Sequence, residues 1–490
     1  MPALNRTTYP ASTYTEKVLQ FGEGNFLRAF TDWQIHQMNQ KANFDAGVVI
    51  VQPLATGMAE RLNEQDGLYT VYLEGIQEGQ PSRTHEVIEC VTRGINPYEH
   101  YEQYEALAYQ PELRWIISNT TEAGIAFNST DQLADRPQQS YPGKLTSLLY
   151  RRFRHFHGEE SKGFIILPCE LIDHNGDELK RIVLQYAELW NLEPEFGAWV
   201  HQANTFCSTL VDRIVPGYPK QRMSEITAEL GYEDQFVVVG EPFHLLVIEG
   251  PAWIEQELPF AQAQLHIKVV SDMAPYRTRK VRILNGAHTA MTPIAYLYGL
   301  NTVAEAVEHP ITGAFVRSLI QDEIIPTLDL PADELEQFAA AVMERFRNPY
   351  VEHFLMSISL NSISKFKTRD LPTLTSYIEQ QHQLTAKLVF SLAALIAFYK
   401  GDRSGEPILL NDDEAVLQQL AELWKDCDNS QSSLHQLVTA VLGEVSFWGM
   451  NLNSYAGLTE QVTTNLYHIQ HQGMVVALQE LMAPSVTPTV

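Results

Sequence analysis

Short runs of apolar, mostly β-branched residues recur through the first half of the chain, and they constrain the fold more than any other feature. Helical patterns separate these runs, which read KVLQF from Lys17, GVVIVQ from Gly47, RWIISN from Arg114, KGFIILPC from Lys162 and QFVVVG from Gln235. Strands that are apolar on both faces are typical of a parallel sheet covered by helices on each side. The sequence therefore predicts an α/β fold with a mostly parallel, Rossmann-type sheet.

Helical patterns replace strand patterns after about Arg282. The segment LPADELEQFAAAVMERF carries Pro331 near its first turn and acidic residues early, as the N-terminus of a helix favours. The most apolar segment, Leu388 to Tyr399, is much shorter than the roughly 20 residues that span a bilayer, which favours a buried helix. We therefore predict a dinucleotide-binding domain over residues 1–278 and a mainly helical domain over residues 279–490.

The charge balance and the cysteines narrow the classes of function. With 34 Lys+Arg against 60 Asp+Glu, the formal net charge is -26, which argues against nucleic acid or an anionic membrane surface as a partner. Cys90, Cys169, Cys207 and Cys427 form no CxxC pair, so neither a disulfide framework nor a thiolate zinc site is indicated. The N-terminus lacks the pattern of a signal peptide. These features predict a cytoplasmic protein with a small-molecule ligand, and they leave its oligomeric state open.

The stretch KVLQFGEGNFLRAF, from Lys17 to Phe30, places two glycines between an apolar run and a helical pattern. If the helix begins near Phe26, Gly22 allows the turn and Gly24 lets the backbone approach a pyrophosphate. Leu27 stands where the third glycine of the usual fingerprint would be, so an ordinary tight turn is the alternative. Contact with the cofactor is predicted for Val18, Leu19, Gln20, Phe21, Gly22, Glu23, Gly24, Asn25, Phe26, Leu27, Arg28 and Ala29. The periodicity also predicts that Phe26, Phe30 and Trp33 share one helix face.

Two further strand ends bear on the cofactor. The second run ends at Gln52, where dinucleotide-binding folds often carry an acid, and no arginine for a 2′-phosphate follows nearby, so NAD is favoured over NADP. The third run continues as NTTEAG, and ligands of open parallel sheets collect at such carboxyl edges. Thr120, Thr121 and Glu122 are therefore predicted to contact the cofactor, with a polar strand-ending turn as the alternative.

The segment YRTRKVRILNGAHTAM holds Lys280, Asn285 and His288. On an α-helix, Lys280 and Asn285 are separated by roughly 140°, whereas Asn285 and His288 share a face. The three side chains are therefore expected to converge only at a helix start, with Lys280 reaching in from the first turn. Periodicity alone favours a solvated lysine, a capping asparagine and a core histidine.

Several motifs in order carry a resemblance to a known family. The spacing Lys-x4-Asn-x2-His occurs together with GEGNFLRA at Gly22, QDGLYTV at Gln65, TTEAG at Thr120, YPGKLTSLLYRRF at Tyr141 and STLVDRIVPG at Ser208. In this combination the sequence resembles the mannitol dehydrogenase family of polyol-specific long-chain dehydrogenases. The match runs over nearly the whole chain, and PCELIDHNGD and RFRNPYVEH resemble members that act on hexuronates.

The resemblance implies hydride transfer between NAD and a secondary alcohol or ketone, without a metal. It implies that Lys280 is the general acid and base, that Asn285 donates a hydrogen bond to the developing alkoxide, and that His288 orients the substrate. Acid-base catalysis of this kind typically contributes about 100 to 10,000-fold. A second polyol dehydrogenase activity of the same family, or a nucleotide-sensing regulatory protein that keeps the fold without catalysis, remain as alternatives.

Two departures from the polyol-oxidising members concern the substrate. Leu171 replaces an asparagine of those members, and Ser357 replaces the arginine that precedes the lysine matched by Lys365. We predict that Lys365, with Lys367 or Arg369 nearby, binds a substrate carboxylate, because an acidic protein that binds an anion needs a local cation. A solvated basic turn is the alternative.

Overall fold

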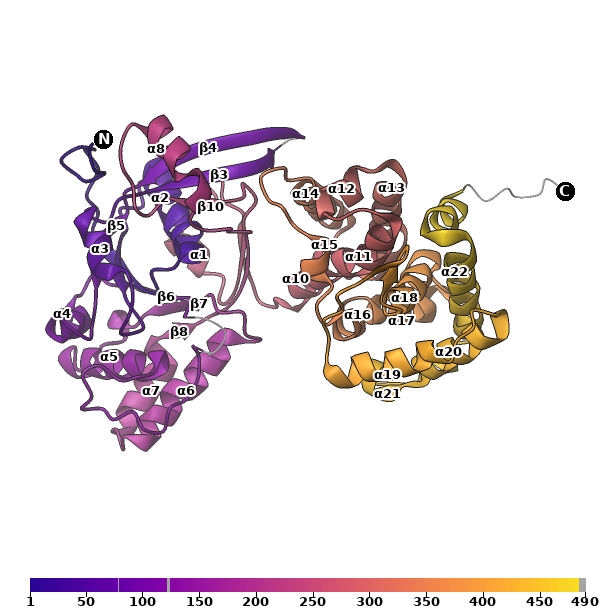
Figure 1. Cartoon of the computed structure of the whole chain (residues 1–490). Helices are drawn as coiled ribbons and strands as arrows, with labels where there is room; N and C mark the ends of the chain where they lie inside the picture. The colour runs from indigo at the N-terminus through magenta and orange to yellow at the C-terminus, as the bar shows by residue number, and fades with distance from the viewer. Residues whose placement is uncertain (78, 121–123, 484–490) are drawn as a thin grey trace. The chain divides into compact units, whose positions relative to one another are not determined.

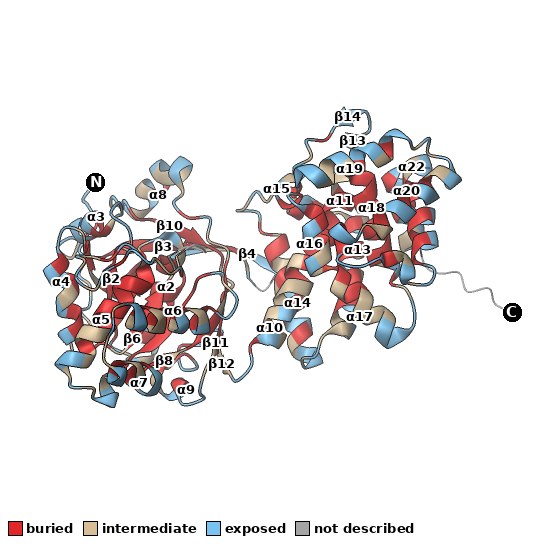
Figure 2. Cartoon of the chain, turned by 90° about the horizontal axis from the view of Figure 1, so that it is seen from below, coloured by how far each residue is buried: buried red, intermediate tan, exposed pale blue. Residues whose placement is uncertain are grey.

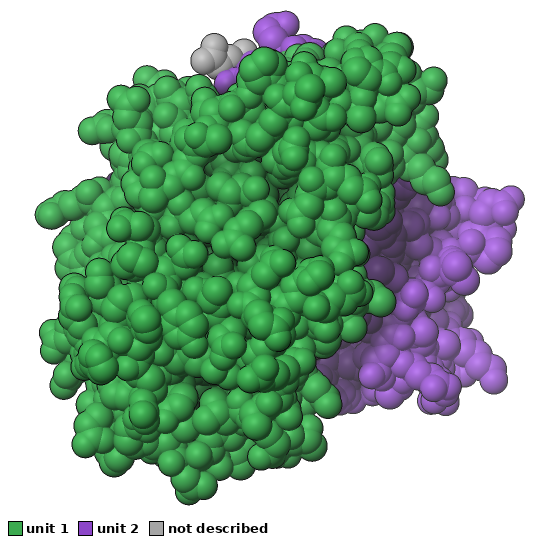
Figure 3. Space-filling view, turned by 90° about the vertical axis from the view of Figure 1, so that its left-hand side faces the viewer, with its two compact units in different colours: residues 1–75, 82–273 green, residues 76–81, 274–490 purple. Residues whose placement is uncertain are grey.

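The computed structural model describes residues 1–77, 79–120 and 124–483 (Figure 1). It divides into two compact units, which Figure 3 colours separately. The first contains Met1–Gly75 and Ser82–Met273, and the second contains Ile76–Pro81 and Ala274–Val490. Within the described residues, no helix combines the length and the apolar character that crossing a membrane requires.

A six-stranded sheet forms the centre of the first unit, and every pair of neighbouring strands in it is parallel. The order is β5-β2-β1-β6-β7-β8, so the chain moves outward from β1 in one direction and from β6 in the other. The strands are β1 Glu16–Phe21, β2 Gly47–Val51, β5 Val91–Ile95, β6 Trp115–Ser118, β7 Ile165–Pro168 and β8 Thr205–Phe206. The predicted α/β fold with a parallel Rossmann-type sheet is confirmed.

Both faces of this sheet are buried, which explains the continuous apolar runs. Val18 and Leu19 are neighbours in β1, and because successive side chains of a strand point to opposite faces, they belong to different core clusters. The helix α2 (Thr31–Ala42) packs on the Val18 side, and α5 (Tyr141–His155) and α6 (Asn175–Leu189) pack on the other. The remaining helices of this unit are α1 Asn25–Arg28, α3 Ala59–Glu64, α4 Tyr101–Ala106, α7 Pro194–Ala203, α8 Met223–Leu230 and α9 Ile254–Glu257.

One predicted strand lies outside the parallel sheet. The run QFVVVG forms β10 (Val238–Gly240), which pairs with β3 (Tyr69–Gln77) in a separate sheet that also contains β4 (Gln80–Ile88). Its assignment to the central sheet was wrong, because an apolar run does not specify which strand it pairs with. A third sheet has the order β12 (Ile267–Val270), β11 (Leu245–Glu249) and β9 (Ser208–Asp212).

The second unit is built from helices around α18 (Ala386–Phe398), whose residues from Leu388 to Phe398 are all buried (Figure 2). The helices α11 (Ala287–Tyr298) and α22 (Leu458–Met482) pack against it, which confirms the prediction of a buried helix. The other helices are α10 Ala274–Arg279, a π-helix at Lys280–Gly286, α12 Val303–Glu308, α13 Pro310–Leu319, a π-helix at Ile320–Ile324, α14 Ala332–Phe346, α15 Leu355–Ile358, α16 Ser362–Arg369, α17 Leu371–Gln381, α19 Glu414–Lys425, α20 Gln431–Gly443 and α21 Val445–Trp448. The short strands β13 (Asp402–Arg403) and β14 (Glu406–Pro407) form a two-stranded sheet.

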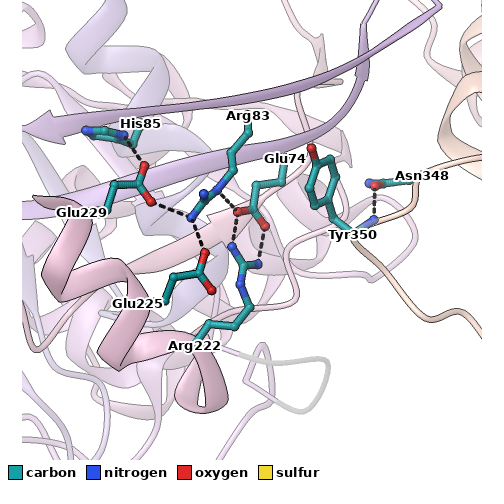
Figure 4. Close-up of polar contacts among 8 residues, drawn as sticks. All are labelled: Glu74, Arg83, His85, Arg222, Glu225, Glu229, Asn348 and Tyr350. Carbon is teal, nitrogen blue, oxygen red and sulfur yellow. Dashed lines mark hydrogen bonds and ion pairs between the residues drawn. The ribbon is translucent and has the colours of Figure 1, made fainter.

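An ion-pair network braces the β3–β4 hairpin within the first unit (Figure 4). The guanidinium of Arg222 donates two hydrogen bonds to the Glu74 carboxylate, at 2.7 and 2.6 Å, and Arg83 Nε donates a third at 2.9 Å. Arg83 also pairs with Glu229 on α8 at 2.8 Å. Burial alone would raise the pKa of Glu74, but the two arginines outweigh burial and lower it.

We expect Glu74→Gln to destabilise the protein by about 2 kcal/mol at pH 7, because it leaves two partly exposed arginines without their shared anion. A carboxylate with a lowered pKa stabilises the fold above its unfolded-state pKa, and this contribution is lost as the pH falls through the folded-state value. Urea unfolding should therefore show a difference between wild type and variant that stays nearly constant from pH 7 to about pH 5 and shrinks below about pH 4. Glu225→Gln is the matched control, since Glu225 lies 3.5 Å from Arg83 but is exposed. If both variants destabilised the protein equally, the buried Glu74 would not contribute more to stability than the exposed Glu225.

Candidate functional site

The loop between β1 and α1 makes a turn that only glycine fits. Gly22 has a φ of 118°, and a Cβ there would lie 2.9 Å from the carbonyl oxygen of Asn119. The loops that follow β1 and β6 are therefore in direct contact at the carboxyl edge of the sheet. Because the strand order reverses between β1 and β6, this edge is the crevice where open parallel sheets bind nucleotides.

The missing third glycine has a structural explanation. Leu27 is buried, and its Cδ1 lies 3.5 Å from the position of a Cβ on Gly22, so its side chain packs onto the turn. A Cβ on Gly24, by contrast, would meet no atom within 4 Å. The loop thus leaves open space above the glycine that was predicted to approach the phosphates.

The helix after the loop differs from the predicted one. The helix α1 ends at Arg28, and α2 begins only at Thr31, so the chain breaks where a continuous helix was expected. The rings of Phe26 and Phe30 stack with centroids 5.0 Å apart. The prediction of one continuous helix was wrong, because periodicity does not reveal a break within an apolar pattern. Phe26, Phe30 and Trp33 nevertheless pack into one core cluster with residues of the sheet, as was predicted.

The side chains of the predicted cofactor-binding residues have different surroundings. Val18, Leu19 and Phe21 fill the core on the two faces of the sheet, so only their backbone could contact a ligand. Arg28 folds back to donate hydrogen bonds to the Glu23 carbonyl at 3.1 Å and to Asn25 Oδ1 at 2.7 Å. It also donates to the carbonyl of Phe236, which ties α1 to another part of the same unit.

Other contacts brace both ends of this segment. The Gln20 amide donates a hydrogen bond to the Gly22 carbonyl at 3.0 Å. The Glu23 carboxylate accepts one from the backbone N–H of Met58 at 3.3 Å. Arg213 Nη1 donates to the carbonyl of Ala29 at 2.6 Å. These contacts fix the loop from within the first unit.

The buried carboxylate of Glu170 holds the loop after β6, a role that the sequence did not suggest. It accepts hydrogen bonds from Ser118 Oγ at 3.0 Å and from both the backbone N–H and the hydroxyl of Thr120 at 2.9 Å. Thr120 is thereby fixed at the carboxyl edge of the sheet, while Thr121 and Glu122 lie outside the described residues.

The end of β2 bears on the ribose of a dinucleotide. The side chain of Gln52 is fully used by the chain that follows, since its amide donates to the carbonyls of Leu54 and Ala55 at 2.8 and 3.1 Å. Its oxygen accepts from the backbone N–H of Ala59. The reversed strand order, the tight turn at Gly22 and the open space at Gly24 fit a dinucleotide at this edge.

A π-helix carries the predicted catalytic residues of the second unit. It runs from Lys280 to Gly286 and continues directly into α11. In a π-helix, hydrogen bonds join residues five apart, so residues i and i+5 lie above one another, as residues i and i+4 do in an α-helix. Lys280 and Asn285 are five apart, and His288 follows one α-helical turn later. The three residues therefore lie in the middle of one continuous helical segment, and not at the helix start that was expected.

His288 is a buried imidazole with an unused nitrogen. Its side chain is 9% exposed, and its Nε2 has no hydrogen-bond partner in the part of the chain that the structure describes. Its ring lies 4.2 Å from Phe346 and 5.0 Å from His353, measured between centroids. Burial lowers the pKa of His288 well below 6.5, and the positive charges of nearby groups lower it further. The ring is thus uncharged at neutral pH and can donate or accept one further hydrogen bond.

The basic groups that act on His288 form a local cluster in a strongly acidic chain. They are His353, Arg345, Arg369 and Lys365. Lys365 and Arg369 are four residues apart on α16, where they share a face, and Arg369 Nη1 donates to Thr289 Oγ1 at 3.2 Å. Lys365 Nζ donates to the carbonyl of Ile358 at 2.7 Å, and burial lowers its pKa. Both predicted carboxylate-binding residues therefore lie near enough to His288 for their charges to lower its pKa.

Sequence reasoning missed Arg345 and His353, although both lie in the quoted segment RFRNPYVEH. The only signal available was the presence of basic residues in an acidic chain. Lys367, named as a possible partner of Lys365, lies two residues away on α16, and its Cε lies 3.3 Å from the position of a Cβ on Gly449. It therefore belongs to another face of the helix.

One group of side chains among the described residues has the spacing of metal ligands. Ligand atoms of Glu60, Glu99 and His100 lie within 4.8 Å of one another, and all three residues are exposed. Exposed acidic groups of this kind are common without a metal. We assign no metal to this group.

Comparison with protein families gives two matches that together cover most of the chain. Residues 16–262 match the model of the mannitol dehydrogenase Rossmann domain, and residues 272–470 match that of the mannitol dehydrogenase C-terminal domain. An altronate oxidoreductase of Bacillus subtilis is 53% identical over 481 residues, covering 98% of each chain. An altronate oxidoreductase of Pectobacterium carotovorum is 48% identical over 485 residues, covering 98% of this chain and 99% of that protein.

Two solved structures share the fold over the full length. A substrate-free D-sorbitol dehydrogenase aligns with a TM-score of 0.79 and 21% identity, covering 97% of this chain and 100% of that one. A ternary complex of Pseudomonas fluorescens mannitol 2-dehydrogenase with NAD and D-mannitol aligns with a TM-score of 0.65 and 21% identity, covering 98% and 99%. At this identity the two structures bear on the fold alone.

Proposed function

The chain belongs to the mannitol dehydrogenase family, and on that premise we propose that it is an NAD-dependent oxidoreductase that interconverts D-tagaturonate and D-altronate. The observation that carries the choice of substrate is the cluster of basic groups around the uncharged His288, in a chain of net charge -26. A neutral polyol does not need such a cluster, whereas a sugar acid carries the carboxylate that it attracts. The altronate oxidoreductases that resemble this chain over their full length support the same substrate.

The proposed roles of the three residues are supported by the family and by their spacing along one continuous helical segment. Lys280 gives a proton to the carbonyl oxygen during reduction and takes it back during oxidation. Asn285, one π-helical turn away, donates a hydrogen bond to the oxygen as negative charge develops there. His288, uncharged and with a free nitrogen, hydrogen-bonds a substrate hydroxyl and orients the sugar. When bound at the edge between β1 and β6, NAD supplies or accepts the hydride.

The proposal includes the cellular setting and the ligand class. The four cysteines are free thiols, as expected in a reducing cytoplasm. The partner is a small hexuronate or aldonate, recognised through its carboxylate by Lys365 and Arg369.

One assay separates the candidate functions. Loss of NADH is followed with purified protein and a panel of D-tagaturonate, D-fructuronate and D-fructose. The proposal predicts the highest kcat/KM for tagaturonate, and a preference for fructuronate or fructose would reject the substrate. A protein that binds NADH but turns over none of these ketoses would favour the nucleotide-sensing alternative.

We expect Lys365→Met to raise the KM for tagaturonate by about 10 to 100-fold, since a hydrogen bond to a charged group contributes about 1.5–3 kcal/mol. The value of kcat should change much less, because the carboxylate does not take part in the chemical step. Steady-state kinetics at saturating NADH measure both.

Lys367→Met is the matched control, since it removes the same charge from the same helix on a different face. Its KM should stay near that of the wild type. Equal KM values for the Lys365 and Lys367 variants would remove Lys365 from the site.

A further inference from the structure

A buried carboxyl group lies beneath the predicted cofactor loop. Asp32 is in the first turn of α2, and its side chain is completely buried. The Tyr69 hydroxyl lies 2.8 Å from Asp32 Oδ2, and the Gln20 amide nitrogen lies 3.4 Å from the same oxygen. Asp32 Oδ1 has no hydrogen-bond partner among the described residues.

Each neighbour of this carboxyl group also contacts one end of the loop. The Gln20 amide donates to the carbonyl of Gly22 at 3.0 Å, at the first residue of the loop. The Tyr69 hydroxyl lies 3.2 Å from the carbonyl of Arg28, at the end of α1. Gln20 and Tyr69 are completely buried as well, so water does not replace these contacts. A single carboxyl group is thus linked to both ends of the segment from Gly22 to Arg28.

The number of available hydrogens favours an uncharged carboxyl group. The Tyr69 hydroxyl has one hydrogen but faces two acceptors, Asp32 Oδ2 and the Arg28 carbonyl. If Asp32 is ionised, the single Tyr69 hydrogen can serve only Oδ2 or the Arg28 carbonyl, so one of these two contacts lacks a hydrogen. Asp32 Oδ1, which is buried and has no partner among the described residues, then also carries part of the negative charge. If Oδ2 is protonated, Asp32 donates to Tyr69, which donates in turn to the Arg28 carbonyl. Both contacts are then satisfied.

The charged and titratable groups around Asp32 agree with this count. Burial raises the pKa of Asp32 to about 7, although Tyr69, Gln20 and the charge of Arg28 lower it. Burial also raises the pKa of Tyr69 and of Cys90 well above their usual values. Burial lowers the pKa of Arg28, which also faces the acidic groups of Asp234 and Glu23. Of these groups, Asp32 is the one with a pKa near neutrality.

We propose that Asp32 is a positioning residue of the cofactor loop and that it works as an uncharged, protonated acid. This inference rests on the proposed function, because it takes the segment from Gly22 to Arg28 as the loop that receives the pyrophosphate of NAD. In its neutral form, Asp32 holds both ends of the loop through Gln20 and Tyr69. In its ionised form, Asp32 competes with the Arg28 carbonyl for the single Tyr69 hydrogen. It also places a negative charge close to the loop that is proposed to hold the two phosphates of NAD. The affinity for NADH should therefore decrease as the pH rises through 7.

The test is a fluorescence titration of NADH, without sugar substrate, at pH 6 and pH 8.5. The Kd of the wild type should be higher at pH 8.5 by about fivefold or more, the lower end of typical coupling between two sites. Asp32→Asn should bind equally well at both pH values, because its amide can donate to Tyr69 and carries no charge. Asp45→Asn, at an exposed aspartate after α2, should keep the pH dependence of the wild type.

A second variant separates positioning from stability. Asp32→Leu removes the hydrogen bonds of the carboxyl group to Gln20 and Tyr69 together with the unpartnered Oδ1. The two side chains that contact the loop are then held less firmly, so the variant should bind NADH more weakly at pH 6 without a lower unfolding temperature. A lower unfolding temperature with unchanged NADH affinity would mean that Asp32 is only a structural residue. The inference would be overturned if the wild type had the same Kd for NADH at both pH values, or if the Kd of Asp32→Asn rose with pH as much as that of the wild type. Either result would leave the proposed function in place. A wild type that does not bind NADH at either pH would overturn both.

Discussion

Lys280→Ala is expected to lower kcat for tagaturonate reduction by about 100 to 10,000-fold, the usual contribution of a positioned general acid. The amine is proposed to protonate the carbonyl oxygen while the hydride arrives, and alanine offers no proton at that position. The KM should change little by comparison, because the carboxylate is proposed to bind elsewhere, at Lys365 and Arg369. Steady-state kinetics in both directions check this, since the same amine serves as the base when altronate is oxidised.

The affinity for NADH distinguishes a catalytic loss from a folding defect. Lys280 lies on a helix of the second unit, whereas the predicted cofactor loop belongs to the first. The Kd of NADH and the unfolding temperature of Lys280→Ala should therefore stay close to those of the wild type. If the variant keeps more than a tenth of the wild-type kcat, another group supplies the proton and Lys280 loses its assigned role.

The sequence predicted those parts of the fold that depend on local patterns. The apolar runs at Lys17, Gly47, Arg114 and Lys162 each contain a strand of the parallel sheet, because burial on both faces requires an apolar residue at every position. The run at Gln235 has the same character but pairs with β3. Strand pairing depends on residues far apart in the sequence, so it cannot be predicted from the composition of a single strand.

The sequence suggested candidate residues for the site but not their geometry. Lys280 and Asn285 have an unfavourable spacing for an α-helix, and apolar periodicity gives no sign of a change to π-helical pitch. Arg345 and His353 reach His288 only through tertiary packing. Asp32 and Tyr69 are far apart in the sequence, so their shared proton is also invisible before the fold is known. Residues that act through other residues, as these do, are not marked by a sequence motif.

Asn285→Ala is expected to lower kcat by about 100 to 1,000-fold, which is the usual loss when one preorganised donor to an oxyanion is removed. Asn285→Asp should be at least as damaging, because a carboxylate of nearly the same shape cannot donate and repels the developing negative charge. The NADH affinity of both variants should match that of the wild type. A kcat within threefold of the wild type would show that the amide does not face the reacting oxygen.

A shift of the asparagine by one position tests where the amide must lie. The double variant Leu284→Asn with Asn285→Leu places lysine and asparagine four residues apart, the spacing that would bring them together on an α-helix. In the π-helix, position 284 is buried, with Leu284 only 6% exposed, so the shifted amide cannot reach the oxygen. We therefore expect the double variant to have a kcat no higher than that of Asn285→Ala. A kcat clearly above that of Asn285→Ala would mean that an amide at position 284 reaches the reacting oxygen, and Asn285 would then lose its assigned role.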